Sequence, residues 1–270
     1  MVDSFLLSAF AFLFFLFAIL VYRQVDFAFL KQGEDIRLSK NVFLFIVLIT
    51  ITVFGTATWF IMSFSGPFVL QTFYICLFAA GTMLSMYLLF PKRFGWYVAN
   101  IGIISLTVPA ILVYHSQLLE NIFMAFSLLW VGPVIFKKFR LTSGYVLAGM
   151  SLFSLINIYD VYLASPSSPA FGDETLLLNG LISFGNVALG MGDFFLAYIA
   201  VNAVQKHVSM RTAVALAFFI AFARFCIRGL FPYYQADIAY SVVITFGTLI
   251  IFASRSFGQR GLEGGGPRQG

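Results

Sequence analysis

Long apolar runs alternate with short polar connections along most of the chain. A helix needs about 20 residues to cross the roughly 30 Å hydrocarbon layer of a bilayer, and most of the runs are close to that length. The pattern predicts nine membrane-spanning helices, at residues 4–22, 42–64, 68–90, 96–114, 118–136, 145–164, 177–204, 212–231 and 237–254. The fold class that follows is all-α, a polytopic transmembrane helix bundle of about nine spans.

No Pro/Ser-rich linker divides the spans into two units. The sequence therefore predicts one transmembrane helical domain at residues 1–254. Residues 255–270 contain the run Gly264-Gly265-Gly266-Pro267 and are predicted to form a disordered tail.

Composition agrees with a membrane protein. Of the 270 residues, 61% are hydrophobic and 10% are charged, whereas a soluble domain carries about 25% charged residues. Cys76 and Cys226 both lie inside apolar runs, and His115 and His207 are far apart in sequence. This pattern indicates neither a disulfide framework nor a metal site, and no metal or organic cofactor is expected.

Apart from Arg224 and Arg228, which lie inside the eighth predicted span, the basic residues lie in every second connection and in the tail. They are Arg23, Lys31, Arg37 and Lys40 in the first, Lys92 and Arg93 in the third, Lys137, Lys138 and Arg140 in the fifth, Lys206 and Arg211 in the seventh, and Arg255, Arg260 and Arg268 in the tail. The positive-inside rule then puts the N-terminus outside and the C-terminus in the cytoplasm. Topology explains the net charge of +5, so no nucleic-acid partner is expected. Short loops and the lack of an ER-retention tail favour a multi-pass protein of a prokaryotic plasma membrane.

Apart from Glu120, which interrupts the fifth span, and Asp237, at the outer boundary of the last, the charged residues inside the predicted spans are Asp160, Asp193, Arg224 and Arg228. An intramembrane charge costs about 2.5–3.5 kcal/mol even on the lenient insertion scale, so each residue marks a potential functional site. At 1.5 Å per residue, Asp160 and Asp193 lie within about one turn of the same depth, on consecutive helices. The sequence therefore predicts that the two carboxyls face each other within hydrogen-bond or one-water reach.

The residues around the aspartates favour close packing. A stripe of small or polar residues at helical spacing includes Asn186, Gly190, Asp193, Ala197 and Ala200. Such a stripe lets a neighbouring helix approach closely. Gly190 and Gly192 also make local unwinding inexpensive, so that backbone could meet a ligand. Asn157, one turn before Asp160, could orient that carboxyl.

Two carboxyls in contact resist ionising together, so they share one proton. The ionised member can take a proton from water while the protonated member polarises a carbonyl, as in aspartic proteases.

The motifs that hold these residues resemble a known family. Tyr159-Asp160 in the sixth span and Gly190-Met191-Gly192-Asp193 in the seventh resemble the paired YD and GxGD motifs of presenilin and signal peptide peptidase, the GxGD intramembrane aspartic proteases. The resemblance implies a presenilin-like bundle, catalytic roles for Asp160 and Asp193, and substrates that are transmembrane helices of other proteins. The cytoplasmic C-terminus is similar to the orientation of signal peptide peptidase. The family's Pro-Ala-Leu motif is not found at the start of the last span, where Pro232-Tyr233-Tyr234 holds the nearest proline.

An alternative interpretation uses the same residues without proteolysis. Arg224 lies at a depth similar to both aspartates, and a guanidinium paired with either one would abolish the shared proton. The protein would then be a transporter or a structural membrane protein with an intramembrane Asp/Arg charge network.

Overall fold

The structure, a computed structural model, describes residues 2–24, 49, 52, 67–89, 94–139, 141–162, 181–185, 187–230 and 240–263. The chain is mostly helical, as the sequence predicts. Its helices and strands are α1 (Val2–Gln24), α3 (Pro67–Leu89), α4 (Phe94–Tyr114), α5 (Gln117–Ser127), α6 (Val131–Pro133), the π-helix η1 (Val134–Lys138), α7 (Ser143–Tyr162), β1 (Leu181–Phe184), β2 (Val187–Gly190), α8 (Met191–His207), α9 (Met210–Leu230) and α10 (Tyr240–Glu263).

Helices α1, α3, α4, α7, α9 and α10 occupy the first, third, fourth, sixth, eighth and ninth predicted spans. The second span, 42–64, lies almost wholly outside the described residues. Within the described part of the chain, two helical stretches are long and apolar enough to cross a membrane, Val2–Arg23 and Gln117–Lys137. These two stretches indicate association with a membrane, whereas nine crossings remain a prediction.

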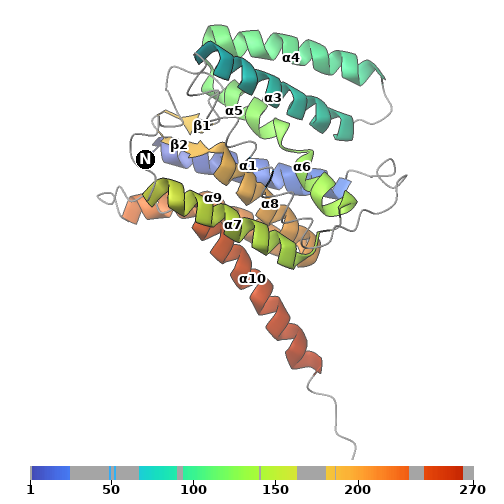
Figure 1. Ribbon diagram of the computed structural model, residues 1–270, viewed down its shortest axis with the longest axis vertical. Coiled ribbons are helices and arrows are strands. Elements are labelled where there is room, and N and C mark those ends of the chain that lie inside the picture. Colours follow the sequence, from blue (N-terminus) through green and yellow to red (C-terminus); the bar gives the residue numbers. More distant parts are fainter. Residues whose placement is uncertain are drawn as a thin grey trace, which may run out of the picture.

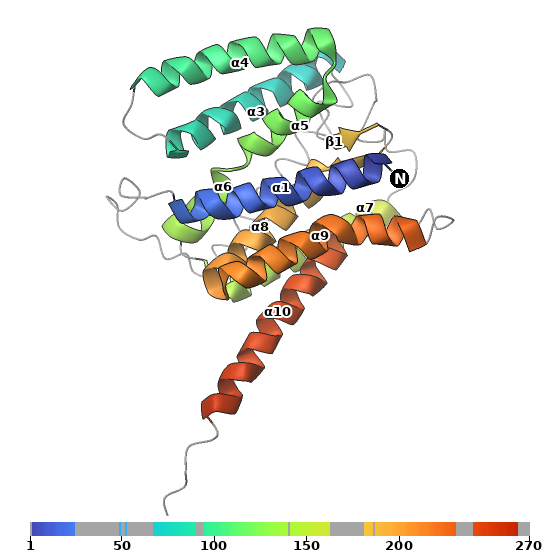
Figure 2. The same cartoon turned by 180° about the vertical axis from the view of Figure 1, so that it is seen from behind.

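The helices form layers around a central pair (Figure 1). Helices α3 and α4 lie together on one side with α5 beneath them, α1 and α8 lie in the middle, and α9 and α7 lie on the opposite side. The view from behind gives the same order, with α10 crossing the lower layer and extending away from the bundle (Figure 2). Helix α8 thus has neighbours on several sides.

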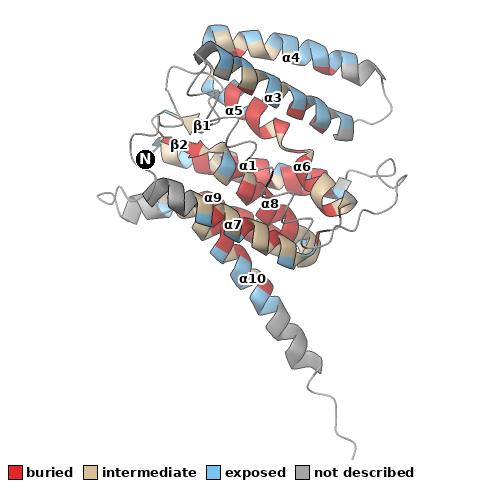
Figure 3. Ribbon diagram, viewed as in Figure 1, coloured by how far each residue is buried: buried red, intermediate tan, exposed pale blue. Residues whose placement is uncertain are grey.

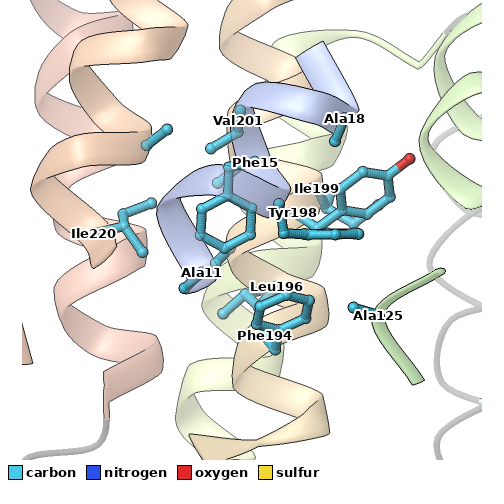
Figure 4. Packing of buried hydrophobic residues seen from close by; sticks show 14 of the residues in the cluster. Ala11, Phe15, Ala18, Ala125, Phe194, Leu196, Tyr198, Ile199, Val201 and Ile220 are labelled. Carbon is cyan, nitrogen blue, oxygen red and sulfur yellow. The ribbon is translucent and has the colours of Figure 1, made fainter. Parts of the chain in front are cut away.

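Burial follows this arrangement. Every residue of α8 from Leu196 to Val204 is buried, whereas α4 exposes much of its surface (Figure 3). A helix that is apolar all round belongs in the interior. The aromatic side chains of α8 pack against α1, with the Phe15 and Phe194 ring centroids 5.2 Å apart (Figure 4). The small residues of the predicted stripe that lie on this helix, Ala197 and Ala200, are fully buried, as close packing requires.

One predicted helix is wrong in its first part. Residues 177–204 were expected to form a single span, but Leu181–Phe184 and Val187–Gly190 pair as an antiparallel hairpin, and the helix begins at Met191. Phe184 pairs with Val187, and Gly185 follows β1 directly. Gly185 has φ +54°, a left-handed conformation that glycine adopts without steric cost. A Gly-Asn pair between two apolar runs is a hairpin signal that outweighs the apolar length of the segment.

The fifth predicted span, 118–136, is interrupted, and Pro133 supplies the reason. Proline has no N–H to donate to the carbonyl four residues earlier, which is that of Leu129. The Tyr198 hydroxyl of α8 donates to the Leu129 carbonyl instead, at 2.8 Å, and accepts the Gly132 N–H at 3.2 Å. On the other side of the break, the Ser85 hydroxyl donates to the Phe126 carbonyl at 2.8 Å. Side chains of α3 and α8 thus satisfy backbone groups that lipid could not.

Helix α10 continues to Glu263, past the predicted start of the disordered tail at residue 255. Each added residue of an established helix gains one backbone hydrogen bond, so a helix can continue beyond the apolar segment that starts it.

Candidate functional site

Asp193 lies in the first turn of α8, directly after the hairpin. Gly190 is both the last residue of β2 and the N-cap of the helix, with φ −59° and ψ 138°. Asp193 is half-buried. The positive end of the helix dipole stabilises a negative charge at this position by about 0.3–1 kcal/mol, and partial burial strengthens the effect. The aspartate therefore lies where extended backbone becomes helix.

The two glycines before Asp193 have different surroundings. A Cβ at Gly190 would meet no described atom within 4 Å. A Cβ at Gly192 would lie 2.9 Å from Cζ of Phe153 on α7, which is closer than real Cβ contacts allow. Gly192 therefore lets α7 approach α8, whereas the space beside Gly190 is open among the described atoms.

The second predicted catalytic residue lies near the end of α7. Asn157, Tyr159 and Asp160 belong to this helix, but their side chains lie outside the described part of the structure. Asp160 follows Phe153 by seven residues, about 10 Å of helix. The side chain of Arg224, on α9, also lies outside the described residues. Carboxyl contact between Asp160 and Asp193, and pairing of either with Arg224, both remain predictions.

The hairpin that precedes Asp193 has two different edges. Along β1, the Asn121 side chain of α5 donates to the Ser183 carbonyl at 2.6 Å and accepts the Ser183 N–H at 3.0 Å. Along β2, no strand other than β1 is paired among the described residues. Asn121 was not among the site residues predicted from the sequence, although an amide inside an apolar segment is a signal of a buried polar contact.

A small cavity lies on one face of β2. It has a volume of about 10 Å³, room for about one water molecule, and the side chains of Val187, Leu189, Ser4, Ser8 and Tyr240 are among those that line it. Asp193 is not part of its lining.

Basic side chains gather at the opposite end of α8 from Asp193. The Lys206 ammonium donates to the Phe136 carbonyl at 2.6 Å, and the Lys137 ammonium donates to the Tyr22 carbonyl at 2.6 Å and lies 4.6 Å from the Tyr22 ring centroid. His207 contacts the Leu141 carbonyl at 3.0 Å through Nε2. The end of α1, the π-helix η1 and the end of α8 therefore meet at one end of the bundle.

His207 gives this end a predicted pH response. Burial and the neighbouring Lys206 charge hold the pKa of His207 below its usual 6.5, so the folded protein binds the proton at lower pH than the unfolded chain. Its contribution to stability is fully present above about pH 6.5 and is lost as the pH falls through that value toward the lowered pKa. We expect the Tm to fall between pH 7 and pH 5 in the parent protein, and the fall to be smaller in His207→Gln. Parallel pH curves for the two proteins would contradict this role.

Among the described residues, no group of three or more His, Cys, Asp or Glu side chains is placed to hold a metal ion. Neither a protein-family model, nor a curated protein, nor a solved structure matches the chain.

Proposed function

We propose that the protein is an intramembrane aspartic endopeptidase, which hydrolyses peptide bonds within transmembrane helices of substrate membrane proteins. Asp160 and Asp193 form its catalytic pair, and Gly190, Gly192, Tyr159 and Asn157 support them. The proposal includes the presenilin-like bundle of nine spans and requires no cofactor.

The observation that carries the proposal is the change from strand to helix at Gly190, three residues before Asp193. A peptide bond inside a helix is shielded by its own hydrogen bonds, so a protease must receive its substrate in extended form. An exposed strand edge binds extended peptides through main-chain hydrogen bonds. The hairpin beside Asp193 supports such a role, because β2 has one side without a paired strand among the described residues.

The chemistry follows from a shared proton. The ionised carboxylate removes a proton from a water molecule, whose oxygen attacks the peptide carbon, and the protonated carboxyl donates to the carbonyl oxygen. The tetrahedral intermediate then collapses, the C–N bond breaks, and a carboxyl proton passes to the leaving nitrogen. Either aspartate can take either role, because the pair titrates as a unit.

The experiment that tests the proposal uses the full chain in lipid vesicles with a reporter that carries one transmembrane helix between two soluble tags. We expect two membrane-proximal fragments, with the new ends inside the reporter helix when read by mass spectrometry. An intact reporter after prolonged incubation would reject the protease and favour the alternative, a transporter or structural protein with a charge network of Asp160, Asp193 and Arg224.

The proposed orientation places the N-terminus outside and the C-terminus in the cytoplasm. The gathering of Lys137, Lys206 and His207 at one end of the bundle supports it, because these residues come from two connections that the positive-inside rule assigns to the same side.

Cysteine labelling tests this orientation. Cys76 and Cys226 are exposed and would first be replaced by serine. A membrane-impermeant thiol reagent added outside intact cells should label single cysteines introduced at Ser65 or Ser167, and should not label those at Ser39 or Ser143. The reverse pattern would invert the topology, and labelling of all four positions after cell lysis is the control for accessibility.

A further inference from the structure

Asn121 acts on β1 as a neighbouring strand would. Its side chain is 1% exposed, and it both donates to and accepts from the backbone of a single residue, Ser183. The two bonds fix the amide orientation, because a flipped amide would put donor against donor and acceptor against acceptor. A paired strand would make the same two bonds.

Gln117 extends this contact by one turn of α5. Its side-chain oxygen accepts the Gly185 N–H at 3.0 Å. Four residues of helix rise about 6 Å, and two residues of strand rise about 6.8 Å, so side chains at positions 117 and 121 can follow the backbone at positions 183 and 185. Helix α5 thereby occupies the outer edge of β1, and an incoming strand cannot pair there.

The same bonds determine which groups of β2 face outward. Since the Ser183 N–H and carbonyl point toward α5, Ser183 and its partner Ala188 form a non-hydrogen-bonded pair. In an antiparallel pair the hydrogen-bonded and non-hydrogen-bonded positions alternate, so Ala188 and Gly190 direct their backbone groups away from β1. The outward-facing backbone groups of Ala188 and Gly190 therefore lie in the strand that directly precedes the helix of Asp193.

We propose that Asn121 is a positioning residue for the protease, which holds the hairpin so that an extended segment of substrate pairs with β2 alone and in one register beside Asp193. This inference rests on the proposed function. It adds that the choice of scissile bond is determined by α5, a helix that carries neither aspartate. A shift of the strand register by one residue would turn every substrate side chain to the other face. The hydrogen bonds from Asn121 to β1 therefore also determine which substrate side chains face the site.

The test compares Asn121→Leu, which keeps the side-chain size and removes both bonds, with Gln117→Leu, which removes only the bond at the turn. Gln117 bonds at an exposed position, so its variant should fold even if Asn121→Leu does not. Met124→Ala is the matched control, because Met124 is a fully buried α5 residue whose truncation should loosen the core and leave the Asn121 bonds in place.

Two measurements are made on each variant in lipid vesicles. Hydrogen exchange of the 181–190 segment should be at least about tenfold faster in Asn121→Leu, less affected in Gln117→Leu and nearly unchanged in Met124→Ala. In Asn121→Leu, the KM for cleavage of the reporter should rise by about tenfold, with a smaller change in kcat. The products of this variant should end at two or more neighbouring bonds.

The outcomes separate this inference from the protease itself. If the parent does not cleave the reporter, the protease and the substrate register both fail. If the parent cleaves it, and Asn121→Leu cleaves the same single bond with the same KM, the positioning role alone is overturned. Equal effects in Asn121→Leu and Met124→Ala would also overturn it, because a general loosening of α5 would then explain both.

Discussion

Asp160→Asn and Asp193→Asn should each reduce reporter cleavage by at least about 1000-fold, because general acid–base catalysis contributes about 10²–10⁴-fold and neither carboxyl can act alone. The double variant should be no worse than either single one, because residues that act as a unit lose their function together. The measurement is the rate at which fragments appear in lipid vesicles, with equal amounts of each protein.

The same variants separate catalysis from a charge network. In a protease, both asparagine variants should remain folded, because a neutral amide costs less in lipid than a charge. In a charge network, loss of the partner would leave Arg224 unpaired, which costs about 3–5 kcal/mol in a buried pair. Thermal stability in detergent distinguishes the two cases.

Arg224→Leu provides the control. Three results together would exclude the protease in favour of the charge network. Asp193→Asn would be unstable, the addition of Arg224→Leu to that variant would restore its stability, and the parent protein would not cleave the reporter. If Arg224→Leu alone leaves cleavage and stability near the parental values, Arg224 is no obligatory partner of the aspartates.

Tyr198→Phe should destabilise the protein by about 3 kcal/mol, which lowers the Tm by roughly 5–10 °C. The change removes one hydroxyl that satisfies two backbone groups at the break between α5 and α6, the Leu129 carbonyl and the Gly132 N–H. Tyr198 is fully buried, so water cannot replace the hydroxyl without opening the core. Thermal unfolding of the detergent-solubilised variants is the measurement.

Gly132→Ala should have a similar effect by another route. Its Cβ would lie 2.7 Å from the Tyr198 hydroxyl oxygen and 3.0 Å from the Asn202 amide, so the bonded atoms must move apart. Tyr114→Phe is the matched control, because Tyr114 is 77% exposed and its loss of a hydroxyl should change stability by less than about 0.5 kcal/mol. If Tyr198→Phe and Tyr114→Phe unfold at the same temperature, the helix break does not depend on the Tyr198 hydroxyl.

The positions of most helices could be predicted from the apolar runs alone. Helices α1, α3, α4 and α9 each begin and end within a few residues of their predicted bounds. A long apolar segment gains from helix formation wherever water is scarce, because its backbone groups then bond within the segment itself. The interruption of the fifth span could also be read from Pro133, although the sequence did not indicate where the freed carbonyl of Leu129 would find a donor.

The hairpin before Asp193 was missed for a physical reason. Residues 181–190 are as apolar as a membrane helix, and apolar length does not distinguish helix from strand. The turn signal in Gly185-Asn186 was local, whereas the hydrogen bonds of Asn121 to β1 and of Gln117 to Gly185 come from residues more than 60 positions earlier. Pairing over that separation is visible only when the chain is folded.

The candidate site divides in the same way. The sequence alone determined which residues carry ionisable chemistry inside apolar segments, Asp160 and Asp193 among them, since a charge in such a segment is costly and therefore conspicuous. Tertiary structure decided that Asp193 begins a helix instead of lying within one, that Gly192 admits Phe153 while Gly190 remains open among the described atoms, and that α5 covers one edge of the hairpin. Those features depend on contacts between the backbone and side chains that are distant in sequence. A linear pattern of polar and apolar residues does not specify such contacts.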